Sequence, residues 1–228
     1  MILIRSARVR SALRWALPLI AIPALVALGA LVSPERTYML IALGVAALSL
    51  LLFCAGFERR QTGSRRMVLT AVMIALCIVG RFIPFFKPVA ALTILTAMYL
   101  GAEAGFLTGA MAAALSNFFF GQGPWTPFQM LAWGLIGLIA GHLAPVLKRR
   151  RWALLLGGLL SAILYSLVMD VWTVLWYEGS LDGGLYAAAM LTALPHTLLY
   201  ALSNVVFLAL LAKPIGSKLA RVRVKYGL

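Results

Sequence analysis

Long apolar segments follow one another along the chain, and short polar or basic stretches separate them. Runs of this length and apolarity predict a bundle of membrane helices. Eight such segments are expected, at residues 15–32, 38–56, 67–80, 89–100, 106–120, 128–147, 152–176 and 185–212. The predicted fold is therefore all-α, with no separate soluble module.

The charged stretch 58–66, with Gly63 and Ser64 inside it, divides these segments into two groups. We expect an N-terminal membrane extension of two helices at residues 1–58, a basic cytoplasmic linker at 59–66, and a six-helix core at 67–228. The first apolar segment also has features of a signal peptide, with a passable cleavage site at residues 27–29. It is long for that role and contains Pro18 and Pro23, so a retained helix is favoured.

Segment 89–100 is too short to cross a membrane upright. Its 12 residues give roughly 18 Å of helix, whereas the hydrocarbon core of a bilayer is about 30 Å thick. The segment must be extended by part of the Phe-rich stretch before it, be half-embedded, or line a cavity. Short or Pro-interrupted segments are pointers to transport sites.

Composition agrees with a membrane bundle, because 63% of the 228 residues are apolar and only 11% are charged. The net charge of +14 is spread over basic clusters at the chain ends and between apolar segments. In the eight-helix topology these clusters share one side, and only Arg36, Arg81 and Lys87 lie on the other. This is the positive-inside pattern, which predicts a plasma-membrane protein with both termini cytoplasmic. It also favours contact with membrane lipid over nucleic-acid binding.

Residues 117–130 interrupt the apolar pattern with two glycines, two prolines, two glutamines, a threonine and Trp125. Irregular polar backbone at membrane depth is tolerated only where protein or a water-filled cavity covers it. The stretch is therefore a candidate lid or wall for a ligand. The alternative is an ordinary tight connection with an interfacial tryptophan.

Asp170 is the only acidic residue deep within an apolar segment. Counted along the helix from Arg151 it lies roughly 28 Å away, near the outer end. It is a candidate ligand contact by the general behaviour of ionisable residues in membranes, or else a snorkelling interfacial side chain. Polar and aromatic residues gathered at the same outer level complete a predicted pocket for a large amphipathic molecule. The candidates are Arg81, Lys87, Asn117, Gln122, Trp125, Thr126, Gln129, Asp170, Trp172, Trp176 and Tyr186.

Catalysis finds little support in the sequence, which has no catalytic motif and no phosphate-binding loop. His142 and His196 lack Cys, Asp or Glu partners at ligand spacing, so neither a metal nor a cofactor is predicted. His196 is expected to hydrogen-bond inside the bundle. One alternative is a lipid enzyme with Asp170 and His196 as acid and base, although His196 is expected roughly 15 Å below the outer surface and Asp170 near it. The other alternative is a solitary ion-coupled transporter, which would need a carboxylate at mid-membrane depth.

Small residues recur at four-residue spacing, which lets helix backbones approach closely. Internal packing is favoured for two of the three sets, while the third either packs internally or presents a smooth face to a partner. The first two sets are Gly105, Gly109 and Ala113, and Gly137 and Gly141; the third is Ala71 and Ala75. Glu103, in the turn before the first set, is expected to pair with a cytoplasmic arginine or to contact a partner.

From about residue 67 onward, the chain resembles the substrate-binding S components of energy-coupling factor (ECF) vitamin transporters. The resemblance is carried by Ala71-x-x-x-Ala75, by Gly101-Ala-Glu-Ala-Gly105-Phe, and by Asn117-Phe-Phe-Phe-Gly-Gln-Gly-Pro-Trp-Thr-Pro-Phe-Gln-Met130 with Trp133-Gly134 after it. It covers about 160 residues, and the loop is most similar to that of the cobalamin-type members. The two N-terminal helices depart from the six-helix pattern.

The resemblance implies a non-enzymatic subunit that captures a vitamin, cobalamin or a related corrinoid, at the extracellular face. It implies docking of the helix face with Ala71 and Ala75 on a transmembrane coupling protein. Two cytoplasmic ATPase subunits would then make the S component topple in the membrane and carry the vitamin inward.

Overall fold

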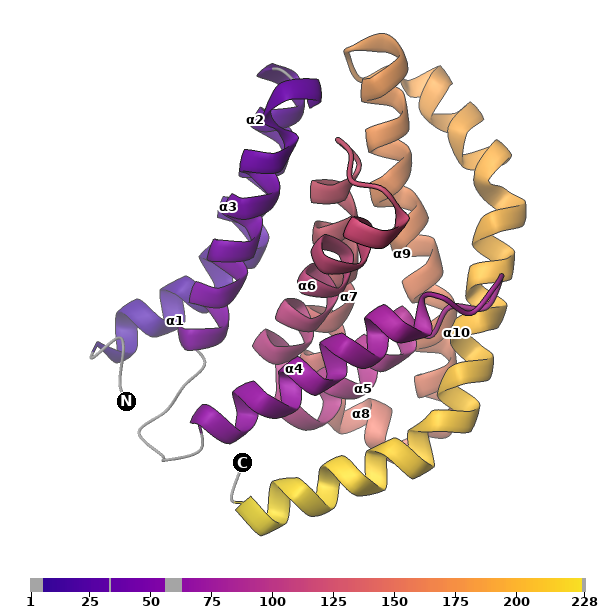
Figure 1. The fold of residues 1–228 in the computed structure, drawn as a ribbon. Helices are drawn as coiled ribbons and strands as arrows, with labels where there is room; N and C mark the ends of the chain where they lie inside the picture. Colours follow the sequence, from indigo (N-terminus) through magenta and orange to yellow (C-terminus); the bar gives the residue numbers. More distant parts are fainter. Residues whose placement is uncertain (1–5, 33, 56–62, 227–228) are drawn as a thin grey trace.

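The computed structural model describes residues 6–32, 34–55 and 63–226, and Figure 1 shows them as a bundle of helices. Within these residues there is no strand, which confirms the predicted all-α membrane bundle. The elements are α1 (Ala7–Ala16), the π-helical turn η1 (Leu17–Ala21), α2 (Ile22–Val32), α3 (Pro34–Ala55), α4 (Gly63–Gly80), α5 (Val89–Leu100), α6 (Ala102–Phe120), α7 (Thr126–His142), α8 (Ala144–Arg149), α9 (Arg151–Glu178) and α10 (Gly183–Tyr226).

The described residues of all eight predicted segments are helical, except that segment 128–147 is divided at Leu143 into α7 and α8. Four helical stretches are long and apolar enough to cross a membrane, namely Arg8–Ala30, Tyr38–Ala55, Arg151–Glu178 and Gly183–Val222. The predicted linker at 59–66 falls partly outside the described residues, and α4 already begins at Gly63.

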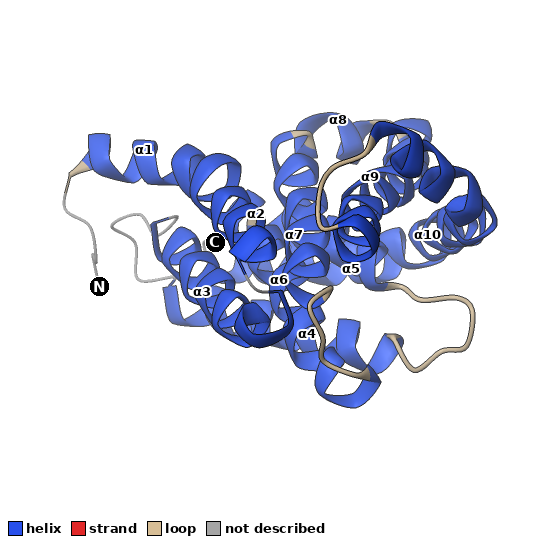
Figure 2. Ribbon diagram, turned by 90° about the horizontal axis from the view of Figure 1, so that it is seen from above, coloured by secondary structure: helices blue, strands red, loops and turns tan. Residues whose placement is uncertain are grey.

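Helix α5 lies in the middle of the bundle. Viewed from above, α5, α6 and α7 lie between α2 and α3 on one side and α9 and α10 on the other (Figure 2). All residues of α5 except Tyr99 are buried, because a helix that is apolar all round is stable only where protein or lipid surrounds it. The short segment thus needs no extension: it ends at Gly101, and neighbouring helices enclose it.

The closest helix contact joins α6 to α7, and glycines make it possible. A Cβ built on Gly109 would lie 2.2 Å from the carbonyl oxygen of Trp133, and one on Gly137 would lie 2.3 Å from that of Gly105. No side chain fits at these distances, so the two backbones touch directly. Internal packing is thereby confirmed as the role of these small residues.

The N-terminal helices pack against the core rather than standing apart from it. Helix α3 contacts α6 and α7, and α2 contacts α3. In Figure 1, α1 lies at the lower end of the α2–α3 pair, and the last part of α10 runs along the lower end of the bundle. Pro214 lies inside α10, where proline favours a bend. We call this side the basic end, because it carries Arg14, Arg66, Lys148, the arginines at 149–151 and Lys218; the opposite side is the outer end.

Candidate functional site

A buried hydrogen-bond network joins α6 to the start of α7 at the outer end. The amide nitrogen of Asn117 donates to Thr126 Oγ1 and to Gln129 Oε1, both at 2.9 Å. Thr126 donates to Gln122 Oε1 at 3.0 Å, and Gln122 Nε2 donates to the carbonyl oxygen of Ala114 at 2.7 Å. Asn117 and Thr126 are fully buried. These predicted site residues therefore bond to one another, and they fix the 121–125 connection against α6.

Arg81 extends this network from the loop between α4 and α5. Its guanidinium donates to Ser116 Oγ and to Asn117 Oδ1. The same group lies over the rings of Phe120, at 4.8 Å, and Trp133, at 5.3 Å. The cation is thus held by amide and aromatic groups, and no carboxylate pairs with it among the described residues.

Aromatic side chains continue from Arg81 into the bundle. Trp133 Nε1 donates to Tyr200 OH at 2.8 Å, and the Trp133 and Tyr165 rings stack with centroids 5.5 Å apart. Tyr165 also contacts Tyr200 edge-on at 5.1 Å and accepts a hydrogen bond from Gln129 Nε2 at 2.9 Å. One cluster therefore links α7, α9 and α10 beneath the polar network.

A cavity of about 330 Å³ opens beside this aromatic cluster. Phe85, Lys87, His196, Leu199 and Tyr200 line it. The cavity lies between the α4–α5 loop and α10, and the loop is fixed there by a 3.2 Å hydrogen bond from Ser203 to the carbonyl oxygen of Lys87. Its volume is in the range of small-molecule sites, about 300–1,000 Å³. Of the residues predicted for the site, only Lys87 lines this cavity directly.

His196 differs from its predicted role. It makes no hydrogen bond in the part of the chain that the structure describes; it is exposed and its ring lies 6.3 Å from that of Tyr200. Asp170 is buried between α9 and α10, within electrostatic range of His196 and beside Ser166. Ser166 in turn bonds to Thr197 at 2.6 Å.

The expected separation in depth between Asp170 and His196 is therefore wrong. Asp170 was counted from the inner end of α9, but α9 continues to Glu178, eight residues further on, so Asp170 lies roughly 12 Å below the outer end of the helix. The bond between Ser166 and Thr197 brings this part of α9 level with His196 on α10. Because the two residues lie close together, a difference in depth no longer argues against Asp170 and His196 acting as an acid–base pair. One carboxylate oxygen of Asp170 has no hydrogen-bond partner.

The remaining aromatic candidates lie at the outer end of the α9–α10 hairpin. Trp172 packs between Phe128, at 5.9 Å, and Trp176, at 5.1 Å. Tyr186 OH donates to the carbonyl oxygen of Leu167 at 3.0 Å, so it ties α10 to α9. Trp125 is partly exposed and folds over Gly123. These residues surround the outer end but do not line the cavity.

Ala71 and Ala75 lie on an exposed face of α4. Large apolar side chains share this face, and they too are exposed: Met67, Val68, Val72, Leu76 and Val79. The rest of α4 packs on α5 and α6. The bundle therefore leaves one apolar stripe of α4 uncovered, with the two alanines along it.

Glu103 forms two ion pairs at the basic end. Its carboxylate oxygens lie 3.1 Å from Arg14 Nε and 3.2 Å from an Arg66 amino nitrogen. Pairing with an arginine is confirmed, and one of the two arginines comes from the N-terminal extension. Trp15 contacts His142 at 4.8 Å in the same region.

The geometry defines a membrane helix bundle with a cavity of about 330 Å³ toward its outer end and an uncovered apolar helix face. Residues 62–221 match the family model described as ECF-type riboflavin transporter, S component. The chain therefore belongs to this family of transporter S components. No curated protein and no solved structure matches the chain. The family supports the predicted S-component class, whereas the cobalamin-type resemblance is not confirmed.

Sequence reasoning missed Phe85, Tyr165, Leu199 and Tyr200. Apolar and aromatic residues are so common in this chain that single ones carry no signal. The spacing of four between His196 and Tyr200, directly after Pro195, is the one pattern that marks this helix face.

Proposed function

We propose that the chain is the substrate-binding subunit of an ATP-driven ECF importer, and that it captures a vitamin at the outer end of the bundle. The observation that carries this proposal is the family match over residues 62–221. The chain has no phosphate-binding loop, so ATP hydrolysis falls to partner subunits. By the positive-inside rule the basic end faces the cytoplasm, with both termini, and the cavity lies toward the outside.

The vitamin we propose is riboflavin rather than a corrinoid. The name of the matching family points to riboflavin. A cavity of about 330 Å³ suits a flavin-sized molecule, whereas a corrinoid with its nucleotide loop is several times larger. The lining also fits, because aromatic walls accept a planar ring and cationic or imidazole groups bind ring carbonyls.

The cavity residues take distinct roles in this proposal. Tyr200 and Phe85 contact the faces of the vitamin ring, while Lys87 and His196 donate to its polar edge. Arg81 stays in the network and positions the loop that carries Lys87. The remaining outer residues, Asn117, Gln122, Trp125, Thr126, Gln129, Asp170, Trp172, Trp176 and Tyr186, support or border the cavity from the α6–α7 connection and the α9–α10 hairpin.

The exposed stripe of α4 is the surface we propose for docking on the ECF transmembrane coupling protein. Small residues let a partner helix approach closely, and the apolar residues beside them can face lipid when no partner is docked. Such a contact is readily reversible, which suits a subunit that must dock and release. The coupling protein in turn connects to two ATPase subunits.

Titration of the purified chain with riboflavin tests the substrate. Quenching of flavin fluorescence reports binding, and cobalamin, cobinamide and smaller vitamins serve as alternatives. His196→Ala and Tyr200→Ala are expected to weaken riboflavin binding by about tenfold or more, the equivalent of one lost polar or aromatic contact. Unchanged affinity in both variants would contradict the cavity assignment.

Docking is tested separately with the double variant Ala71→Trp, Ala75→Trp. It is expected to abolish uptake in cells that supply the coupling protein and ATPases, while vitamin binding by the purified chain is unchanged. Ala47→Trp, at an exposed alanine on α3, controls for a bulky side chain facing lipid and should retain uptake. Normal uptake by the double variant would contradict docking through α4.

A further inference from the structure

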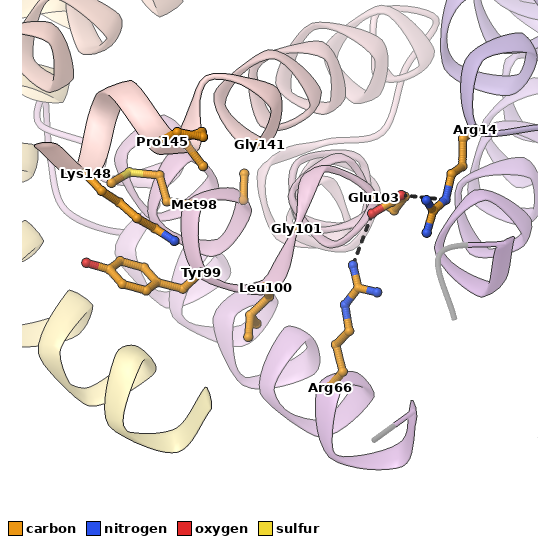
Figure 3. Close-up of a pocket in the computed structure, with 12 residues that line it drawn as sticks. Arg14, Arg66, Met98, Tyr99, Leu100, Gly101, Glu103, Gly141, Pro145 and Lys148 are labelled. Carbon is orange, nitrogen blue, oxygen red and sulfur yellow. Dashed lines mark hydrogen bonds and ion pairs between the residues drawn. The ribbon is translucent and has the colours of Figure 1, made fainter. Parts of the chain in front are cut away.

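Among the other cavities, the one at the basic end is lined by charged residues and shares no lining residue with the proposed vitamin cavity. Its volume is about 460 Å³, and α1, α4, α5, α6, α7 and α8 contribute to its lining. We call it the basic-end pocket. Figure 3 shows its charged residues arranged around it, with Glu103 between Arg66 and Arg14 and with Lys148 beside Tyr99. Neither the family match nor the proposed vitamin site gives this pocket a role.

The side chains that line the pocket carry more positive than negative charge. Arg14, Arg66 and Lys148 are cations, and Glu103 is the one acidic residue of the lining. Both oxygens of Glu103 are engaged by the two arginines. Lys148 lies apart from that pair, with its ammonium 4.7 Å from the centre of the Tyr99 ring. The lining therefore favours an anion.

The position of the pocket indicates which anion. Beside it, the C-terminal part of α10 lies against Tyr99 at Gly216, where a Cβ would be 2.6 Å from the tyrosine hydroxyl. That part of α10 carries the exposed residues Lys213, Lys218 and Arg221. Basic residues gathered at a membrane boundary attract anionic lipid headgroups. Arginine and lysine are also the residues that bind phosphate best.

We propose that the basic-end pocket binds the phosphate group of an anionic phospholipid. Lys148 and Arg66 approach the phosphate oxygens from opposite sides of the pocket, and Arg14 adds a third cation. Because Arg14 belongs to α1, the site is complete only when the N-terminal extension is packed on the core. Binding of the lipid thus holds α1 and α8 at one headgroup, which gives the extra helices a role that the six-helix core lacks.

Native mass spectrometry of the purified full chain tests this proposal. Phosphatidylglycerol is added in one arm, phosphatidylcholine in the second and inorganic phosphate in the third. Wild-type protein is expected to retain phosphatidylglycerol in preference to phosphatidylcholine. Lys148→Gln should weaken that retention by about tenfold, the size expected for one charge-assisted hydrogen bond. Arg8→Gln removes the same charge from an exposed position of α1 outside the lining and should leave retention unchanged.

A second variant should change the retention of phosphatidylglycerol in the opposite direction. Glu103→Gln removes the only negative charge of the lining and releases both arginines toward the anion, so retention of phosphatidylglycerol should rise. Thermal unfolding in the same detergent verifies that each variant is folded.

Three results would overturn the proposal. Equal retention by wild type and Lys148→Gln would exclude this pocket as the site. Equal retention of both lipids would show that acyl chains alone account for binding. Binding of inorganic phosphate without phosphatidylglycerol would assign the pocket to a free anion instead.

Discussion

Asn117 hydrogen-bonds to Arg81 and also helps to fix residues 121–125 against α6. Replacing Asn117 therefore tests this hydrogen-bond network directly. Asn117→Ala removes two neutral hydrogen bonds, each worth about 1 kcal/mol, and one acceptor of a charged donor, worth about 1.5–3 kcal/mol. The side chain is fully buried, so water cannot replace these contacts. The expected loss in the free energy of unfolding is about 3.5–5 kcal/mol. At about 2–4 °C per kcal/mol for a chain of this size, Tm should fall by about 7–20 °C.

A double-mutant cycle makes this prediction specific. Arg81→Gln and Asn117→Ala remove opposite ends of one contact, so the double variant should lose less than the sum of the two single variants. The expected coupling is about 1 kcal/mol or more. Unfolding is followed by intrinsic tryptophan fluorescence in detergent.

Asn204→Ala is the matched control for this cycle. Asn204 is also a fully buried amide, but it bonds to Gly158 and Ser161 instead of Arg81. Its combination with Arg81→Gln should be additive within about 0.5 kcal/mol. If Arg81 and Asn117 were also additive, the reasoning that joins the two loops through one hydrogen-bond network would be refuted.

Three further predictions concern packing and charge. Gly109→Val should prevent folding, because its Cβ meets the Trp133 backbone, while Gly183→Val, with open space around it, should fold; size-exclusion chromatography distinguishes them, and a folded Gly109→Val would contradict the contact. Asp170→Asn should raise Tm by a few degrees, because it removes the charge from a buried carboxylate with an unpaired oxygen; a lower Tm would indicate an unrecognised partner. Burial lowers the pKa of Lys87, and the charge of Arg81 lowers it further. The folded state therefore releases this proton at lower pH than the unfolded state, so stability should rise with pH between the two pKa values. Lys87→Gln should remove that rise, and an unchanged pH profile would contradict the assignment.

The helices and their internal contacts were largely predictable from the sequence. The four-residue spacing of small residues predicted the packing role of Gly105, Gly109 and Gly137. Only glycine permits backbone contact between helices. The length of the apolar run at 89–100 correctly predicted that α5 is a short helix. The sequence did not show that α5 lies at the centre of the bundle. A helix that is apolar on every face has the same sequence pattern whether protein or lipid surrounds it.

The arrangement of the outer end was not predictable in the same way. The polar residues at 117–129 were expected to face a ligand, and in the structure Asn117, Thr126 and Gln129 bond to one another. A sequence shows which groups need partners but not whether a ligand or a neighbour supplies them. Depth was also misjudged for Asp170, because it was counted from the inner end of α9 and the helix continues for eight residues beyond it.

The central claim is that this chain binds a vitamin on its own. The most direct measurement is a titration of the detergent-purified chain with riboflavin, followed by flavin fluorescence. We expect saturable binding with a Kd below about 1 μM, which corresponds to a binding free energy of about −8 kcal/mol or stronger. Absence of binding by riboflavin, cobalamin and every other vitamin tested, with a folded protein, would contradict it.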